Sequence, residues 1–219
     1  MCLVYTAIDD ASFAGRMLES PLRIFVQHVL EGGDIAIARA HLLLAMFPER
    51  VHLERGVRYL DIFGSDIEAV KCLAGPYGFS TCATCTECNT IQTREFLTVV
   101  VSELAQGLDV MLAGFFNIGV PCQECRSPST QSTFLFTNPF MIVDMTTKCV
   151  SLELIPQEMQ LAAARFSLAG IALHRPGHYY AYIRHGANFY VYDDLQTQIG
   201  TSVSLAGRQV VSFLIYKIL

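Results

Sequence analysis

The sequence predicts an α+β fold, in which helices come first and a mostly antiparallel sheet follows. Apolar residues recur at three- and four-residue steps in "SPLRIFVQHVLEGGD" and "DIAIARAHLLLAMF", which is the helical period. From residue 79 onward the period becomes two, and β-branched and aromatic residues dominate, as is typical of strands. We therefore expect one domain over residues 1–219, with a helical lobe followed by a β lobe.

Composition excludes several classes of protein. At 219 residues and 52% hydrophobic content, the chain can bury a full core. The net charge is −5 and there is no basic run, which disfavours nucleic-acid binding. No apolar run reaches about 18 residues, so we expect no membrane span, and the first residues lack the features of a secretory signal. These observations favour an intracellular protein of the cytoplasm or nucleus.

Helix boundaries are marked by glycine and by capping residues. The stretch "GGD" at residues 32–34 predicts the end of one helix and the start of the next. In "GSDIEAVKCLAGP", Ser65 and Glu68 form a capping-box pattern, and "GP" at residues 75–76 would end that helix. We expect the first 75 residues to be helical throughout.

The second half carries the strand pattern. Residues 185–187 have the composition of a hairpin turn, so the strands on either side should be antiparallel neighbours. The predicted strands lie in "REFLTVVVSEL", "FMIVDM", "RFSLAGIALH", "HYYAYIRHG", "NFYVYDD" and "VVSFLIYKIL".

Five of the eight cysteines form a metal-binding pattern. They lie in "CATCTEC" and "CQEC", and two CxxC turns that present two sulfurs each are what a tetrahedral zinc site requires. Because the strand "YGFSTCAT" runs up to Cys85, we expect Cys82 to be a strand residue. The predicted ligands of Zn²⁺ are then Cys85, Cys88, Cys122 and Cys125. A closed four-sulfur site is structural, while the alternative is a pair of redox-active CxxC turns.

The stretch "HRPGHYYAYIRHGANFYVYDD" carries the candidates for catalysis. His178 lies near Asp193 across the predicted hairpin, where a carboxylate can bind one ring nitrogen and leave the other to act as a base. An isolated strand histidine that only packs is the alternative. We expect His174 to pack and Asp194 to cap or contact structure.

Several segments together resemble the ubiquitin-specific protease family, the papain-like cysteine peptidases that cleave ubiquitin from its conjugates. "GHYYAYIRHGANFYVYDD" resembles the histidine box of that family, and "VVSFLIYKIL" resembles its last strand. "GSDIEAVKCL" resembles the family's Gln-Gln-Asp-x-x-Glu-Phe helix, with Asp66 in place, and "TNPFMIVDM" resembles the strand after the fingers. "YGFSTCATCTECNTIQTREFLTVVV" and "CQEC" are similar to the two knuckles of its zinc fingers.

The resemblance implies a compact papain-like cysteine protease fold with a zinc-finger insertion. Its parts would be a thumb-like helical lobe over residues 1–78, zinc-binding fingers over 79–137 and a palm-like β-rich region over 138–219. His178 would be the general base and Asp193 the residue that orients it.

The nucleophile of the resembled family would stand in "VYTAIDDASFAG", and the ungapped match puts Ala7 at its position. Three explanations stay open: an engineered inactivating substitution, a native pseudoenzyme, or Cys2 as the nucleophile after a shift of register. The family's oxyanion asparagine has no counterpart here, so Asp10 or a backbone amide would have to serve. We expect the remaining cysteines, Cys72 and Cys149, to pack.

The implied function is a thiol-dependent deubiquitinase that cleaves after the C-terminal Gly-Gly of ubiquitin or of a ubiquitin-like modifier. Its partner would be that modifier, with structural zinc as the only cofactor. Two other functions remain open. A native Ala7 would leave a ubiquitin-binding module without turnover, whereas a viral-type papain-like protease would cut a polyprotein after Gly-Gly.

Overall fold

The computed structural model describes residues 21–61, 79–96, 98–101, 107–117, 121–128, 130–136, 140–161, 163–193 and 200–219. The chain divides into two compact units, Leu3–Gly75 and Pro76–Leu219. Each unit is described by itself below.

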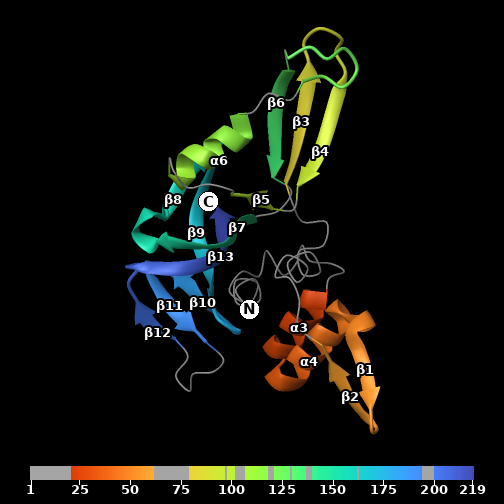
Figure 1. Ribbon diagram of the computed structural model, residues 1–219, viewed down its shortest axis with the longest axis vertical. Helices are drawn as coiled ribbons and strands as arrows, with labels where there is room; N and C mark the ends of the chain where they lie inside the picture. Colours follow the sequence, from red (N-terminus) through yellow and green to blue (C-terminus); the bar gives the residue numbers. More distant parts are fainter. Residues whose placement is uncertain are drawn as a thin grey trace. The chain divides into compact units, whose positions relative to one another are not determined.

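Two helices form the core of the first unit. Helix α3, Pro21–Leu30, packs against helix α4, Ile35–Met46 (Figure 1). Asp34 caps α4, because its carboxylate accepts hydrogen bonds from the backbone N–H of Ala36 at 2.7 Å and of Ile37 at 3.1 Å. The predicted helix break at residues 32–34 is confirmed. Among the described residues of this unit, the buried side chains are Phe25, Val26, Ala38, Leu42, Met46 and Phe47.

A β-hairpin follows α4 where the sequence pattern predicts helix. After a short 3₁₀ turn, η1 (Pro48–Arg50), strands β1 (Val51–Glu54) and β2 (Val57–Leu60) pair in antiparallel register. Both turn residues have positive φ, +50° at Arg55 and +78° at Gly56, as in a type I′ turn. The expectation of helix throughout residues 1–75 is therefore wrong here. The predicted helix in "GSDIEAVKCLAGP" lies outside the described residues.

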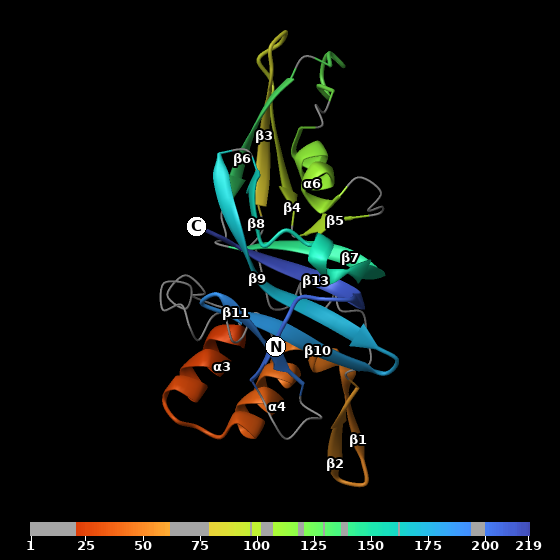
Figure 2. The same ribbon diagram turned by 90° about the vertical axis from the view of Figure 1, so that its left-hand side faces the viewer.

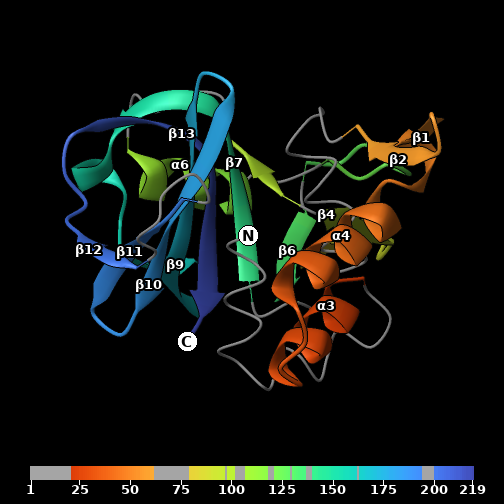
Figure 3. The same ribbon diagram turned by 90° about the horizontal axis from the view of Figure 1, so that it is seen from below.

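The second unit is built on a large sheet. Its strands run in the order β12-β11-β10-β9-β13-β7-β5, with β8 also paired to β9. Among the described strands of this sheet, β5 and β7 form the one parallel pair. The predicted hairpin turn is confirmed, because β10 ends at His185 and β11 begins at Asn188 (Figure 3). The strands are β5 (Val99–Val100), β7 (Phe140–Ser151), β8 (Glu158–Leu161), β9 (Ala164–Arg175), β10 (His178–His185), β11 (Asn188–Tyr192), β12 (Thr201–Val203) and β13 (Arg208–Ile218), with a 3₁₀ turn, η2 (Leu152–Leu154).

A second, three-stranded sheet carries the cysteines. Strand β3 (Phe79–Cys85) lies between β4 (Ile91–Phe96) and β6 (Thr130–Phe136), as Figure 2 shows. Phe79 pairs in register with Phe96 and Phe136, and the ring of Phe136 meets Phe166 of β9 edge to face at 5.0 Å. This aromatic row joins the base of the small sheet to the core of the large one.

One helix interrupts the β region. Helix α6, Leu108–Asn117, packs against β8, and its residues Leu108 and Leu112 are buried in the core. These two leucines are four residues apart, which is the helical spacing. The expectation that the period is two from residue 79 onward therefore does not hold for this segment, where the sequence predicted no helix. The most deeply buried core residues of the sheet include Leu168, Ile171, Leu173, Val211, Leu214 and Tyr216.

Candidate functional site

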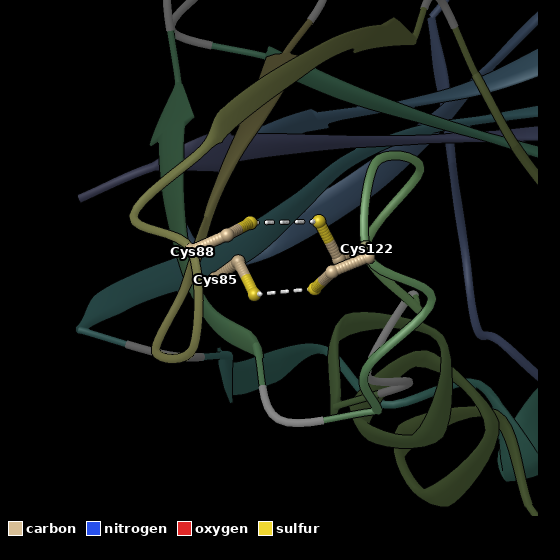
Figure 4. A group of neighbouring side chains, drawn as sticks. Cys85, Cys88 and Cys122 are labelled. Atoms are coloured by element: carbon tan, nitrogen blue, oxygen red, sulfur yellow. Dashed lines mark hydrogen bonds between the residues drawn. The ribbon is translucent and has the colours of Figure 1, made fainter.

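Four cysteine sulfurs converge at the end of the three-stranded sheet. The Sγ atoms of Cys85, Cys88, Cys122 and Cys125 all lie within 4.8 Å of one another. Two pairs are closest: Cys85 with Cys125 and Cys88 with Cys122, each at 3.5 Å (Figure 4). Each close pair joins the two CxxC turns to one another.

The two CxxC turns have the same backbone geometry. In the first, the N–H of Asn89 donates to the carbonyl of Cys85, and the N–H of Cys85 donates to the carbonyl of Thr90, both at 3.0 Å. In the second turn, residues 122–127 repeat both bonds at the same spacing, at 2.9 Å. The residue after each second cysteine has positive φ, +56° at Asn89 and +60° at Arg126. Two equivalent turns therefore present their sulfurs to one point.

The fifth cysteine of this region lies away from the cluster. Cys82 is in the middle of β3, paired with Thr93 of β4 and Thr133 of β6, and its carbonyl accepts a hydrogen bond from the Thr133 hydroxyl. The structure thus places Cys82 in a strand, and in the described part of the chain the cluster consists of the other four cysteines.

The donor set fits a zinc ion. Tetrahedral coordination at a Zn–S distance of about 2.3 Å separates the sulfurs by about 3.8 Å, close to the spacing in the cluster. Contact with the Thr90 hydroxyl lowers the pKa of Cys88 to about 6. The backbone N–H of Ser127 lowers the pKa of Cys125, and the neighbouring Cys85 sulfur raises it. The net effect is that the pKa of Cys125 is raised to about 12. Such crowded thiols do not all ionise unaided, and a divalent cation bound by the four sulfurs would supply the missing positive charge.

His178 and Asp193 form the second group of interest. Nε2 of His178 lies 2.6 Å from Oδ1 of Asp193, within hydrogen-bond distance. The Asp193 side chain is 3% exposed and that of His178 is 19% exposed. A buried carboxylate at this distance fixes the tautomer with the proton on Nε2. Nδ1 is then the ring nitrogen with the lone pair.

Strand geometry accounts for this approach. Pro176 and Gly177 connect β9 to β10, and Gly177 has a φ of +75°, as position i+2 of a type II turn requires. His178 therefore begins β10 directly after the turn. Ala181 of β10 pairs with Tyr192 of β11, so Asp193, the next residue after Tyr192, lies opposite Tyr180. Because His178 precedes Tyr180 by two residues, Asp193 lies diagonally across from His178 on the same face of the sheet. The predicted approach of Asp193 to His178 across the hairpin is thus present, and its diagonal geometry comes from the register.

The other residues singled out in the sequence are placed as follows. The ring of His174 packs against Tyr179 at 4.7 Å, as expected. Cys149 is exposed, so the expectation that it packs is wrong; it points outward because its neighbour Val150 faces the core. Outside the described residues are Cys2, Ala7, Asp10, Ser65, Glu68, Cys72 and Asp194.

Two residues of the His178 site were missed in the sequence. Tyr180 is buried beside His178, and its hydroxyl donates to Oε1 of Gln209 at 2.9 Å. In the sequence, Tyr180 is one of several aromatic residues in an alternating strand pattern, so nothing distinguishes it. Gln209 comes from β13, 29 residues away, so no local pattern connects the two.

Comparison with known proteins gives a likeness of fold. No protein-family model matches the chain, and no curated protein matches it. A chain from a structure of the SAGA Ubp8/Sgf11/Sus1/Sgf73 DUB module, with one substitution in Ubp8, matches 99% of this chain at 13% identity and a TM-score of 0.53. A chain from another structure of that module matches 68% of this chain at 16% identity and a TM-score of 0.47.

The protein thus has a mixed helix-and-sheet fold, rich in strands, like that of the first matched chain. It spans 64% and 39% of the lengths of the two matched chains, less than two thirds of each. Among the described residues, no helix is long and apolar enough to cross a membrane.

Proposed function

We propose that the chain is a compact papain-like domain of the deubiquitinase type, with a structural zinc site in its fingers. The observation that carries the proposal is the His178–Asp193 pair, with its 2.6 Å contact and a nearly buried carboxylate. A base held in one tautomer by a carboxylate is the partner that a nucleophilic thiol needs. The likeness of fold to a chain of a DUB module supports the same class.

The chemistry would proceed by acyl transfer. In an Ala7→Cys chain, the thiolate would attack the carbonyl carbon of the last glycine of the ubiquitin tail, and Nδ1 of His178 would take up the thiol proton. His178 would return that proton to the leaving amine as the C–N bond breaks, and water would then hydrolyse the thioester. Asp193 would hold the imidazole and stabilise its protonated form. A backbone N–H group would stabilise the oxyanion, because the carboxylate at Asp10, the other candidate, offers no hydrogen-bond donor when it is ionised.

The four cysteines would hold Zn²⁺ as a closed structural site. When bound, the ion would fasten the two CxxC turns and supply no catalytic chemistry, because four sulfurs leave no coordination position for substrate. Reduced thiolates are maintained in the cytoplasm and nucleus, which are the proposed locations.

Ala7 decides between an enzyme and a binding module. An alanine side chain cannot attack a carbonyl, so the chain as given would bind ubiquitin without turnover unless Cys2 serves instead. The experiment mixes the chain with ubiquitin that carries a C-terminal thiol-reactive group and measures intact mass. The variants are Ala7→Cys, Cys2→Ser and the two combined.

Each outcome has a distinct meaning. An adduct on Ala7→Cys and on the double variant, and none on the parent chain, supports the nucleophile position at residue 7. An adduct on the parent that Cys2→Ser abolishes moves the nucleophile to Cys2. If no variant forms an adduct and ubiquitin does not bind, the deubiquitinase proposal is overturned. Cleavage of a Gly-Gly peptide without folded ubiquitin would instead favour a polyprotein protease.

A further inference from the structure

Tyr180 lies next to both members of the His178–Asp193 pair, whose own atoms are in direct contact at 2.6 Å. It follows His178 by two residues on β10, so both side chains are on the same face of the sheet. The register that pairs Ala181 with Tyr192 puts Tyr180 beside Asp193 on the neighbouring strand. Tyr180 is 5% exposed and belongs to the core of the large sheet. The pair therefore lies at the end of the packed core, with this ring next to it.

The rings of Tyr180 and His178 are nearly parallel. Their planes differ by 7° and their centroids are 6.5 Å apart. Tyr182, the next aromatic residue on that face, meets Tyr180 edge to face instead, at 68° and 5.9 Å. The parallel arrangement is thus particular to the histidine.

Tyr180 is itself held from two sides. Its hydroxyl donates to Oε1 of Gln209 at 2.9 Å, and this bond reaches from β10 to β13, past the intervening strand β9. The guanidinium carbon of Arg175 lies 4.4 Å from the ring centroid, within the range of a cation–π contact. A hydrogen bond in the ring plane and a cation over the ring together restrict its tilt.

The contact to Asp193 does not by itself restrict every motion of the imidazole. With Cβ and Nε2 both fixed, the ring can still turn about the line that joins them, and this turn moves Nδ1. Nδ1 is the atom that would exchange a proton with the nucleophile. A misplacement of about 1 Å in such a site can cost about 10²-fold in rate. A flat neighbour held parallel to the imidazole opposes this turn.

We propose that Tyr180, held by Gln209 and Arg175, is the positioning residue that fixes the plane of the His178 imidazole. The catalytic part of this proposal rests on the proposed function, in which His178 is the general base. Its structural content is independent of turnover, because it concerns the tautomer and orientation of one imidazole.

The first test is a spectroscopic one on the chain as given. Histidine is labelled with ¹⁵N, and His178→Gln assigns the resonances of residue 178 among the six histidines. In the parent we expect one protonated and one unprotonated ring nitrogen, with slow exchange of the Nε2 proton. Tyr180→Leu should bring the two ¹⁵N resonances towards each other and speed that exchange. Tyr180→Phe keeps the ring and the Arg175 contact but loses the bond to Gln209, so its signals should lie between those of the parent and of Tyr180→Leu.

Phe189→Leu is the matched control. Phe189 is 4% exposed, belongs to the same core and has Arg184 over its ring at 6.0 Å, but it does not stack on His178. Its truncation should destabilise the sheet to a similar extent and leave the His178 signals unchanged. Parent-like signals in Tyr180→Leu, or an equal change in Phe189→Leu, would overturn the positioning role.

A second readout separates this proposal from the proposed function. In the Ala7→Cys background, Tyr180→Leu should slow the reaction with the ubiquitin probe by about 10²-fold, and Phe189→Leu should change it much less. If Ala7→Cys does not react at all, the proposed function fails, while the ¹⁵N spectra still decide whether Tyr180 orients His178. Normal probe reaction in Tyr180→Leu would overturn the catalytic meaning of the positioning role.

Discussion

The side chain of His28 folds over Gly33, the glycine just before the cap of α4. A Cβ atom at position 33 would overlap the imidazole ring of His28. Because the overlapping atoms are the far end of a half-buried side chain that can move, we expect a cost at or below the lower end of the about 1–3 kcal/mol seen for core overpacking. Gly33→Ala should therefore lower the protection of the α3 and α4 amides against hydrogen exchange. The double variant Gly33→Ala/His28→Ala should recover most of that loss. No recovery would show that the cost of a side chain at position 33 does not come from overlap with the His28 ring.

The carboxylate of Glu153 gives one expected pH dependence. The Ser151 hydroxyl and the backbone N–H of Gly207 donate to it, and these bonds lower its pKa from 4.5. A carboxylate whose pKa is lower in the folded than in the unfolded state stabilises the fold at pH values above its unfolded-state pKa. That stability is lost as the pH falls through the folded-state pKa. Denaturant unfolding of Glu153→Gln should hence depend less on pH below 4.5 than that of the parent.

Glu158→Gln is the control for Glu153→Gln. Its carboxylate meets Arg165 in an exposed ion pair at 3.1 Å, and such pairs contribute little. If both substitutions reduced the pH dependence of the free energy of unfolding below pH 4.5 to the same extent, the assignment to Glu153 would be contradicted.

At the scale of residues, the sequence predicts those groups whose partners lie within one hairpin. His178 and Asp193 are 15 residues apart and share a predicted turn, so their approach follows from strand alternation. Cys82 could be separated from the other cysteines because a strand pattern runs through it. Gln209 could not be connected to Tyr180, since their contact depends on how three strands are ordered in the sheet.

At the scale of elements, the pair of CxxC turns predicts a metal dependence. Cys122 is 1% exposed and lies 3.5 Å from Cys88 in sulfur–sulfur distance. Cys122→Ser should reduce bound zinc from about one ion per chain to near zero, measured by elemental analysis after desalting. Cys82→Ser is the matched control and should retain the metal. Loss of zinc in Cys82→Ser, or none in the parent, would contradict the four-sulfur assignment.

Two elements departed from the sequence pattern for reasons of context. The β1–β2 hairpin carries little burial, with Leu53, Val57 and Tyr59 exposed, so its alternation does not stand out as a core-facing strand. Helix α6 is rich in the apolar and aromatic residues that strands also favour. For such short apolar segments, periodicity alone does not separate helix from strand.

At the scale of the molecule, the centre of the large sheet should dominate stability. Leu214 of β13 is fully buried and pairs with Ile171 of β9 and Val143 of β7. Leu214→Ala should lower the free energy of unfolding by about 2–5 kcal/mol, as measured by denaturant titration. Leu154→Ala, at a position that is 76% exposed, should change it by less than about 0.5 kcal/mol. Equal effects would contradict the central role of β13.

The order of strands in the large sheet also has a consequence for biosynthesis. Strand β13 is the last that the structure describes, yet it lies between β9 and β7, which are made earlier. During translation, the edges of β7 and β9 that pair with β13 should stay unpaired until β13 has left the ribosome. Unpaired, apolar strand edges are where nascent chains aggregate or bind chaperones. We therefore expect the large sheet to close only after β13 has been synthesised, and its folding to be slow because the pairing is long-range.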